Sequence, residues 1–187
     1  MPASPFHALH AAMQSQVDRG FLPGVSTALL RGREVVDQFI CGQADMEAGV
    51  PLREDHIFRV FSNTKLPVSC AVLLLMEDGR LALDDPIERF IPQFGSRQVL
   101  RPGATRIGDV EPARTPITVR HLMTHTSGLG YGLFDPGTPL FNAYTQAGVH
   151  DPRLTQAQFI DRLAALPLGF HPGERWEYSL ATDVLGR

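Results

Sequence analysis

Lysine is almost absent from this sequence. Of the 17 basic residues in the 187-residue chain, 16 are arginine and one is Lys65. A general preference for arginine at solvated positions accounts for the 16 arginines but not for the single lysine. A guanidinium keeps its proton inside a protein, whereas burial can push an ammonium toward the neutral amine. We therefore expect Lys65 to have a chemical role that arginine could not fill.

Targeting and membrane segments are also missing from the sequence. Residues 1–13 have neither the charged region nor the uninterrupted apolar run of a secretory signal. No apolar run approaches the roughly 20 residues that a membrane helix requires. The formal net charge is -3 and the basic residues are scattered, so no nucleic-acid surface is indicated. We expect a cytoplasmic protein, unless a leader was removed, with neither nucleic acid nor a membrane as a partner.

Cysteine is scarce, since the sequence has only Cys41 and Cys70, each in an apolar stretch. In a cytosolic chain such a pair is more often two buried thiols than a disulfide, and we expect buried thiols here. The hydrophobic content of 43% and charged content of 20% exclude a disordered chain. They indicate one domain, or most of one.

The first 80 residues show helix and strand patterns. Apolar residues at helical spacing predict a helix over 5–19, and β-like runs at 24–30 and 34–41 predict a hairpin. The stretch 62–76 is apolar on nearly every side, which predicts a helix buried at the centre of a domain. A lone hairpin is marginal in water, and such a helix needs a larger sheet to cover it. We therefore expect further strands beyond Arg187 and a chain that is truncated, cleaved or split.

The second half of the sequence is richer in loops. Thr155 and Gln158 have the spacing of a capping box, which predicts a helix ending near Leu166. Short helices are expected at 84–91, at 118–124 and from 179 onward, with loops at 95–116 and 127–137. The predicted organisation is the N-terminal part of an α/β domain (1–79), an inserted, mostly helical and loop-rich region (80–178), and the start of a further helix (179–187).

Ser62 and Lys65 lie three residues apart at the start of the predicted apolar helix, so their side chains share one face. A serine hydroxyl becomes a nucleophile when a base takes its proton, and a neutral lysine amine within reach can do so. The positive end of the helix dipole disfavours an ammonium in the first turn and favours the oxyanion of acyl transfer. The pair predicts a serine nucleophile with a lysine base. The alternative is a helix-capping Ser62 and a solvated Lys65.

Other residues that could bear chemistry have plainer interpretations. His121 and His125 have the spacing of metal ligands, but Leu122 stands where a zinc protease has glutamate, so structural histidines are expected. The glycines of 127–137 lack the flanking residues of a phosphate-binding loop, which favours a mobile rim loop. The absence of a G-x-S-x-G sequence disfavours an α/β-hydrolase. We expect no metal and no organic cofactor.

Three groups of residues together resemble a known family. They are Ser62 and Lys65 with Asn63 and Thr64 between them, the stretch HLMTHTSGLGYG at 121–132, and Tyr178 followed by Ser179 and Leu180. In this order and spacing they resemble the serine β-lactamase-like superfamily, and family VIII carboxylesterases most of all. The resemblance spans nearly all of the chain. It implies the N-terminal part of an α/β fold, in which helices flank an antiparallel sheet that is incomplete here and a mostly helical region is inserted.

The resemblance also implies roles for individual residues. Ser62 would be the acylated nucleophile, Lys65 its proton partner, and Tyr178 the phenol that relays the proton to the leaving group and then activates water. The chemistry of the groups agrees, because a phenol beside a cationic lysine is drawn toward phenolate and the two titrate together. Tyr131, in the glycine-rich loop, is a candidate for lining the acyl pocket, with simple packing as the alternative.

Two departures from the family pattern bear on function. Class C β-lactamases carry an asparagine two residues after the tyrosine, where this chain has Leu180, which favours an esterase for short-chain acyl esters. The family's C-terminal strand, which supplies a second oxyanion donor, does not follow Tyr178 in this chain. Loss of one such donor costs on the order of 10²–10³ in rate. We expect this chain to be inactive unless a second polypeptide supplies the rest.

The expected function is therefore hydrolysis of a small-molecule ester through a Ser62 acyl-enzyme. A β-lactamase or D,D-peptidase is the alternative within the same class. A non-catalytic fragment or binding module, which keeps the front half of the fold, is the alternative from a different class.

Overall fold

The computed structural model describes residues 5–187, which divide into two compact units. The first unit extends to Arg59 and the second runs from Val60 to Arg187. The division into two units follows from which residues pack together. The organisation into 1–79, 80–178 and 179–187 that the sequence predicts stays a prediction.

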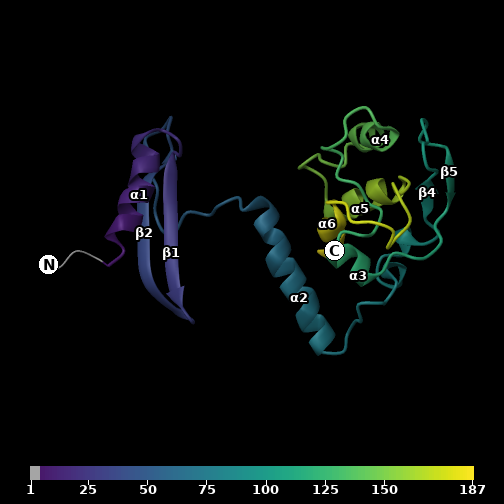
Figure 1. Ribbon diagram of the computed structural model, residues 1–187, viewed down its shortest axis with the longest axis horizontal. Coiled ribbons are helices and arrows are strands. Elements are labelled where there is room, and N and C mark those ends of the chain that lie inside the picture. The colour runs from purple at the N-terminus through teal and green to yellow at the C-terminus, as the bar shows by residue number, and fades with distance from the viewer. Residues whose placement is uncertain (1–4) are drawn as a thin grey trace. The chain divides into compact units, whose positions relative to one another are not determined.

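The first unit is a helix packed on a small antiparallel sheet. Helix α1 (His7–Asp18) lies along the hairpin of β1 (Gly24–Arg31) and β2 (Glu34–Asp45), and β3 (Val50–Pro51) pairs with the other edge of β2 (Figure 1). The imidazole of His10 stacks on Phe39, with ring centroids 4.5 Å apart. The predicted helix and hairpin are thus confirmed, with β2 four residues longer than expected.

The second unit is mostly helical, with one small hairpin. A 3₁₀ turn, η1 (Phe61–Thr64), leads into the long helix α2 (Lys65–Glu77). The remaining elements are the 3₁₀ turns η2 (Ile87–Arg89) and η3 (Pro92–Phe94), the paired strands β4 (Gln98–Leu100) and β5 (Val110–Pro112), and the helices α3 (Val119–Met123), α4 (Pro139–Ala147), α5 (Gln156–Ala164) and α6 (Ala181–Leu185). None of the helices described in either unit is long and apolar enough to cross a membrane.

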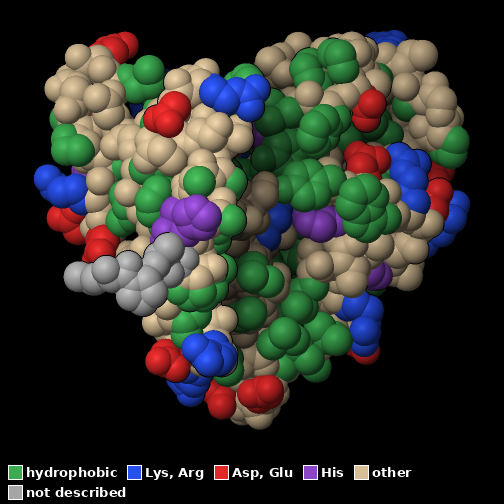
Figure 2. Space-filling model, turned by 60° about the vertical axis from the view of Figure 1, so that its left-hand side comes forward, with side chains coloured by type: hydrophobic (Ala, Val, Ile, Leu, Met, Phe, Trp, Pro, Cys, Tyr) green, Lys and Arg blue, Asp and Glu red, His purple; other side chains and the backbone are tan. Residues whose placement is uncertain are grey.

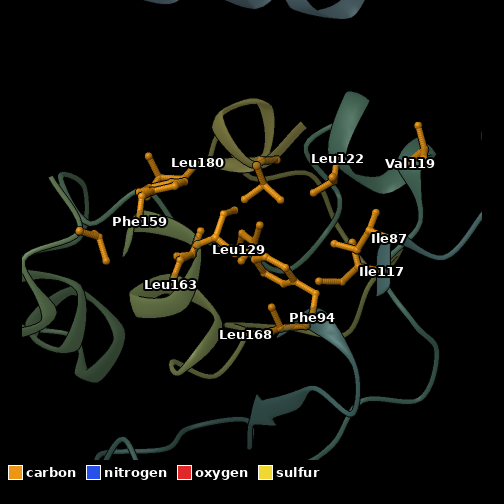
Figure 3. Packing of buried hydrophobic residues seen from close by; sticks show 14 of the residues in the cluster. Ile87, Phe94, Ile117, Val119, Leu122, Leu129, Phe159, Leu163, Leu168 and Leu180 are labelled. Atoms are coloured by element: carbon orange, nitrogen blue, oxygen red, sulfur yellow. The ribbon is translucent and has the colours of Figure 1, made fainter. Parts of the chain in front are cut away.

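The core of the second unit lies among α3, α5, α6 and the loops between them. Figure 3 shows Leu129 at the middle of this core, between Leu163 and Leu180, with Phe94 and Leu168 below it. Leu163 and Leu168 have no exposed surface, and Leu129 and Phe94 have almost none. At roughly 25 cal/mol per Å² of apolar surface removed from water, this cluster is the main source of stability for the unit. The cluster therefore holds in place the loops that follow Leu129 and Leu168. It also holds the short helix α6.

Two predicted elements of the second unit differ from the structure. The helix expected at 84–91 is only the turn η2, because Pro86 is extended and bridges to Thr118. The loop expected at 95–116 contains β4 and β5, each three residues long, and Leu168 pairs with β4 from far along the chain. Pairing between such short, distant segments leaves no local periodicity to detect.

Two other helices show clear capping signals. Helix α4 was not predicted, although Thr138 caps it and Pro139 occupies its first position, which is a recognisable start. The capping box of Thr155 and Gln158 forms as predicted at the start of α5.

Helix α2 is less covered than the sequence predicts. Val72 is its only fully buried residue, whereas Leu66, Leu73 and Leu74 are 72%, 45% and 61% exposed. Figure 2 shows hydrophobic side chains gathered at the surface of one face. The prediction of burial on every side is therefore wrong for the chain described here, because the elements of the second unit pack against one side of α2 only.

The prediction of two buried thiols is also wrong. Both cysteines are free, Cys70 is exposed on α2, and Cys41 on β2 is half-buried. An apolar sequence context indicated burial, but the uncovered side of α2 carries Cys70.

Candidate active site

Ser62 lies at an unusual point of the backbone, in the turn that precedes α2. Its neighbour Phe61 has a φ of 45°, a left-handed conformation that is rare for a bulky residue and that clusters at functional sites. Ser62 is in the 3₁₀ turn η1, and Lys65 is the first residue of α2. Residues three apart eclipse one another in a 3₁₀ turn, so the two side chains lie on the same side. The Lys65 amine donates to the Ser62 hydroxyl oxygen at 3.4 Å.

Tyr178 reaches the same point from the other end of the second unit. Its phenol oxygen lies 2.6 Å from Oγ of Ser62, although 116 residues separate the two. The segment that carries Tyr178 precedes α6 and is held by backbone bonds on both sides. The N–H of Glu177 donates to the carbonyl of His125 at 2.9 Å, and the N–H of Leu180 donates to the carbonyl of Gly130 at 3.1 Å. The structure thus brings together Ser62, Lys65 and Tyr178, the three residues that the sequence nominates.

The electrostatics of this cluster act mainly on Tyr178. Its hydrogen bond with Ser62 lowers the pKa of the phenol, and Lys65 lowers that pKa further, while burial acts in the opposite direction. The Lys65 amine lies 5.0 Å from the centre of the Tyr178 ring. A cation over an aromatic ring and beside its phenol oxygen favours the phenolate. The arrangement can therefore take a proton from the Ser62 hydroxyl and hold it next to the reacting atom.

Tyr131 also joins the site, as part of an aromatic wall. Its ring centroid lies 5.4 Å from that of Tyr178 and 5.4 Å from that of Phe134, and the Lys65 amine is 6.0 Å from its centre. Behind this wall is a cavity of about 250 Å³, which Trp176 also lines. Sequence reasoning did not select Phe134 or Trp176. Two signals in the sequence could have indicated them. Phe134 is an aromatic residue inside a glycine-rich loop, and Trp176 comes two residues before Tyr178.

The loop that carries Tyr131 is closely packed over its first half, whereas the sequence predicts a mobile rim. A side chain at Gly128, whose φ is 83°, would meet the carbonyl oxygen of Phe170 at 2.2 Å. The buried N–H of Gly130 donates to the phenol oxygen of Tyr144 at 3.0 Å. Ser127 and Leu129 are almost fully buried. Close backbone packing, rather than freedom of movement, explains why glycine occurs here.

The two histidines considered as metal ligands have separate places. Nδ1 of His121 accepts a hydrogen bond from the N–H of Thr118 at 3.2 Å, and so completes a capping box at the start of α3. His125 lies beside Tyr178, with ring centroids 4.9 Å apart. Burial lowers the pKa of His125, and the charge of Lys65 lowers it further. Across residues 5–187, no group of three or more His, Cys, Asp or Glu side chains could hold a metal ion.

Comparison with known proteins gives concordant matches over almost the whole chain. Residues 9–187 match the model of the Beta-lactamase family. Esterase EstB of Burkholderia gladioli is 42% identical over 169 residues, which cover 88% of this chain and 40% of that protein. Among solved structures, EstCE1, a hydrolase with promiscuous acyltransferase activity, is similar with a TM-score of 0.77 and 32% identity, over 94% of this chain and 43% of its own.

A second structural neighbour has a different described activity. Simvastatin synthase LovD of Aspergillus terreus has a TM-score of 0.74 and 28% identity, over 98% of this chain and 46% of its own. The chain therefore spans about two fifths of the length of the proteins that it matches.

Proposed function

Because the chain belongs to the Beta-lactamase family, we propose that the whole protein is a serine hydrolase that cleaves short-chain acyl esters through an acyl-enzyme at Ser62. The observation that carries the proposal is the 2.6 Å contact between the Ser62 hydroxyl and the Tyr178 phenol, beside the only lysine of the sequence. The esterase activity named for EstB supports the reaction class.

The proposed acylation begins with Tyr178 as phenolate. The Ser62 proton passes to the phenolate, Oγ attacks the ester carbonyl carbon, and the bond to the alcohol oxygen breaks. Tyr178 then gives the same proton to the departing alkoxide. The Lys65 amine is farther from Oγ, at 3.4 Å, so its main part is to stabilise the phenolate and to keep Ser62 oriented.

Deacylation reverses these roles with water as the nucleophile. Water loses a proton to the Tyr178 phenolate, attacks the acyl carbon, and releases the carboxylic acid as Ser62 regains its proton. An alcohol in place of water would instead receive the acyl group. EstCE1 is described as having promiscuous acyltransferase activity, so acyl transfer is the second candidate function for this site.

The cavity beside Tyr178 supports small apolar substrates. Its volume of about 250 Å³ is below the 300–1,000 Å³ of typical ligand pockets, and aromatic rings line it. The side chain of Leu180 is apolar and is buried in the core, so it offers no hydrogen bond to a substrate amide. We therefore favour an ester over the amide bond of a β-lactam or peptide.

The rest of the protein would complete the site. We propose that the second oxyanion donor comes from outside these 187 residues, either along the same polypeptide or from a second one. We further propose a cytoplasmic enzyme whose partner is a small-molecule ester, without nucleic acid, membrane or cofactor. A non-catalytic fragment remains the alternative of a different class.

Acylation of the full-length protein tests the proposal directly. We expect p-nitrophenyl butyrate to give a burst and turnover, and a fluorophosphonate probe to add its mass at Ser62. Ser62→Ala should abolish both, whereas Ser69→Ala, at a serine in the adjoining helix α2, should abolish neither. Undiminished labelling of Ser62→Ala would refute the nucleophile. Faster opening of a chromogenic β-lactam than of the ester would select the β-lactamase alternative.

A further inference from the structure

His125 contacts four consecutive residues that include Tyr178. Its carbonyl accepts the N–H of Glu177 at 2.9 Å, and its Nδ1 accepts the N–H of Ser179 at 3.3 Å. Its ring lies 4.9 Å from that of Tyr178, at an interplanar angle of 31°, and meets Trp176 edge-on at 6.5 Å. One residue therefore fixes the backbone on both sides of Tyr178 and contacts a face of its ring.

We propose that His125 is a positioning residue that holds the Tyr178 phenol against Ser62, an inference that rests on the proposed function. His125 is not placed to take part in the chemistry itself, since its hydrogen bonds go to the backbone and side chain of its neighbours. Its effect reaches the reaction through the position of Tyr178.

The hydrogen bond to Ser179 determines the tautomer of His125. A backbone N–H can only donate, so Nδ1 must be unprotonated and Nε2 carries the proton. The hydroxyl of Ser179 lies 3.2 Å from the same Nδ1 and accepts the N–H of Ala181 at 3.3 Å. Ser179 is fully buried, so in the folded protein its N–H depends on His125 for an acceptor. The imidazole thus connects the Tyr178 segment to the start of α6.

The backbone conformation at position 125 limits which amino acids could take the place of histidine. Its φ is 54°, in the left-handed region that glycine adopts freely and asparagine tolerates. The following N–H, of Thr126, donates to the carbonyl of His121 at 2.9 Å, which anchors this conformation to α3. A residue here must therefore accept the left-handed backbone and also present an acceptor at its δ position. Histidine and asparagine meet both conditions, whereas glycine meets only the first.

The length of the tyrosine side chain makes this support important. The reacting oxygen is at the far end of the ring from the backbone, so a small rotation of the segment moves it by a large fraction of an ångström. A misplacement of about 1 Å can cost on the order of 10² in rate. The 2.6 Å contact with Ser62 would lengthen with such a rotation.

Two variants of the full-length protein separate the side chain from the backbone. His125→Gly keeps the left-handed backbone and the carbonyl but removes the acceptor and the ring, and we expect kcat to fall on the order of 10²-fold with KM within about twofold. His125→Asn keeps an acceptor at the δ position and should stay within about threefold of the wild-type kcat. Ser96→Gly, an exposed residue with a φ of 49°, is the matched control for backbone relaxation and should leave both constants unchanged.

A double mutant distinguishes positioning from general destabilisation. If His125 acts through Tyr178, His125→Gly should cost nothing further in the Tyr178→Phe background. Equal losses in both backgrounds, or no rescue by His125→Asn, would overturn the inference. Should His125→Gly fail to fold, ¹⁵N spectra of the wild-type protein decide, because they must show the Nε2–H tautomer of His125, and the Nδ1–H tautomer would contradict it. Failure of the proposed function is a different result, namely no acylation of wild-type Ser62.

Discussion

The phenol oxygen of Tyr178 is closer to the Ser62 hydroxyl than the Lys65 amine is, at 2.6 Å against 3.4 Å. The sequence places Lys65 next to Ser62, three residues away, and Tyr178 at the far end of the chain. In the folded unit the order of proximity is reversed. In the proposed mechanism the phenol is therefore the group that accepts the Ser62 proton, and the lysine stabilises the phenolate.

Tyr178→Phe should keep the fold and lose turnover. Only the phenol oxygen is removed, while the ring continues to pack against His125 and Tyr131. We expect kcat for p-nitrophenyl butyrate to fall by about 10²–10⁴-fold, the usual contribution of a general acid–base group. Tyr131→Phe, which removes the phenol oxygen from the neighbouring ring, is the control and should retain most of the rate. A near-normal rate in Tyr178→Phe would remove Tyr178 from the mechanism.

The pKa of Tyr178 should rise when either polar neighbour is removed. Ser62 and Lys65 both lower it below the ordinary value of about 10 for tyrosine. Ser62→Ala and Lys65→Met should therefore each shift the titration of Tyr178 to higher pH. The measurement is the ¹³Cζ chemical shift of labelled tyrosine against pH, with Tyr178→Phe to assign the signal. An unchanged or lower pKa in both variants would show that the contacts do not act on the phenol.

Sequence reasoning predicted the family, the fold class and the members of the candidate site, but not how the site is supported. The comparisons confirm the superfamily and the fold, and Ser62, Lys65 and Tyr178 meet as expected. These residues have chemistry that a pattern can reveal. His125 was interpreted as structural because it forms only part of a metal-ligand pattern with His121, and Leu122 stands where that pattern has glutamate. Its contacts come from a left-handed turn and from a segment about 50 residues away, which local spacing does not encode.

The aromatic wall predicts a specific effect on substrate binding. Phe134 lines the cavity beside Tyr178, whereas its neighbour Leu133 is similarly exposed and does not line it. Phe134→Ala should raise KM for aryl or branched acyl esters roughly two- to tenfold with little change in kcat, because an aromatic contact is worth about 0.5–1.5 kcal/mol. Leu133→Ala should change neither constant. Ester series that vary the acyl group or the alcohol group separately would show which part the cavity holds. Equal effects of the two substitutions would contradict the role of Phe134.

Stability should fall as the pH drops through the range in which free histidine is protonated. Burial lowers the pKa of both His121 and His125 below the ordinary value of about 6.5. As the pH falls through 6.5, the unfolded chain binds protons that the folded chain does not, so the free energy of unfolding decreases. Urea unfolding between pH 8 and pH 5 should show this loss, and His125→Asn should show a smaller slope. A slope that is identical in the variant would mean that His125 does not contribute.

Tyr144→Phe should destabilise the second unit through one missing oxygen. Tyr144 has no exposed surface, and burial raises its pKa, so it is a neutral phenol at any working pH. Its oxygen accepts the buried N–H of Gly130, whose carbonyl in turn accepts the N–H of Leu180. Phenylalanine would leave the N–H of Gly130 without a partner, which costs about 1–3 kcal/mol in the free energy of unfolding. Tyr131→Phe is again the control for urea unfolding. Gly130 precedes Tyr131 and its carbonyl holds the Tyr178 segment through Leu180, so kcat should also fall, but less than in Tyr178→Phe. Unchanged stability would show that water hydrogen-bonds to the N–H of Gly130 in the variant.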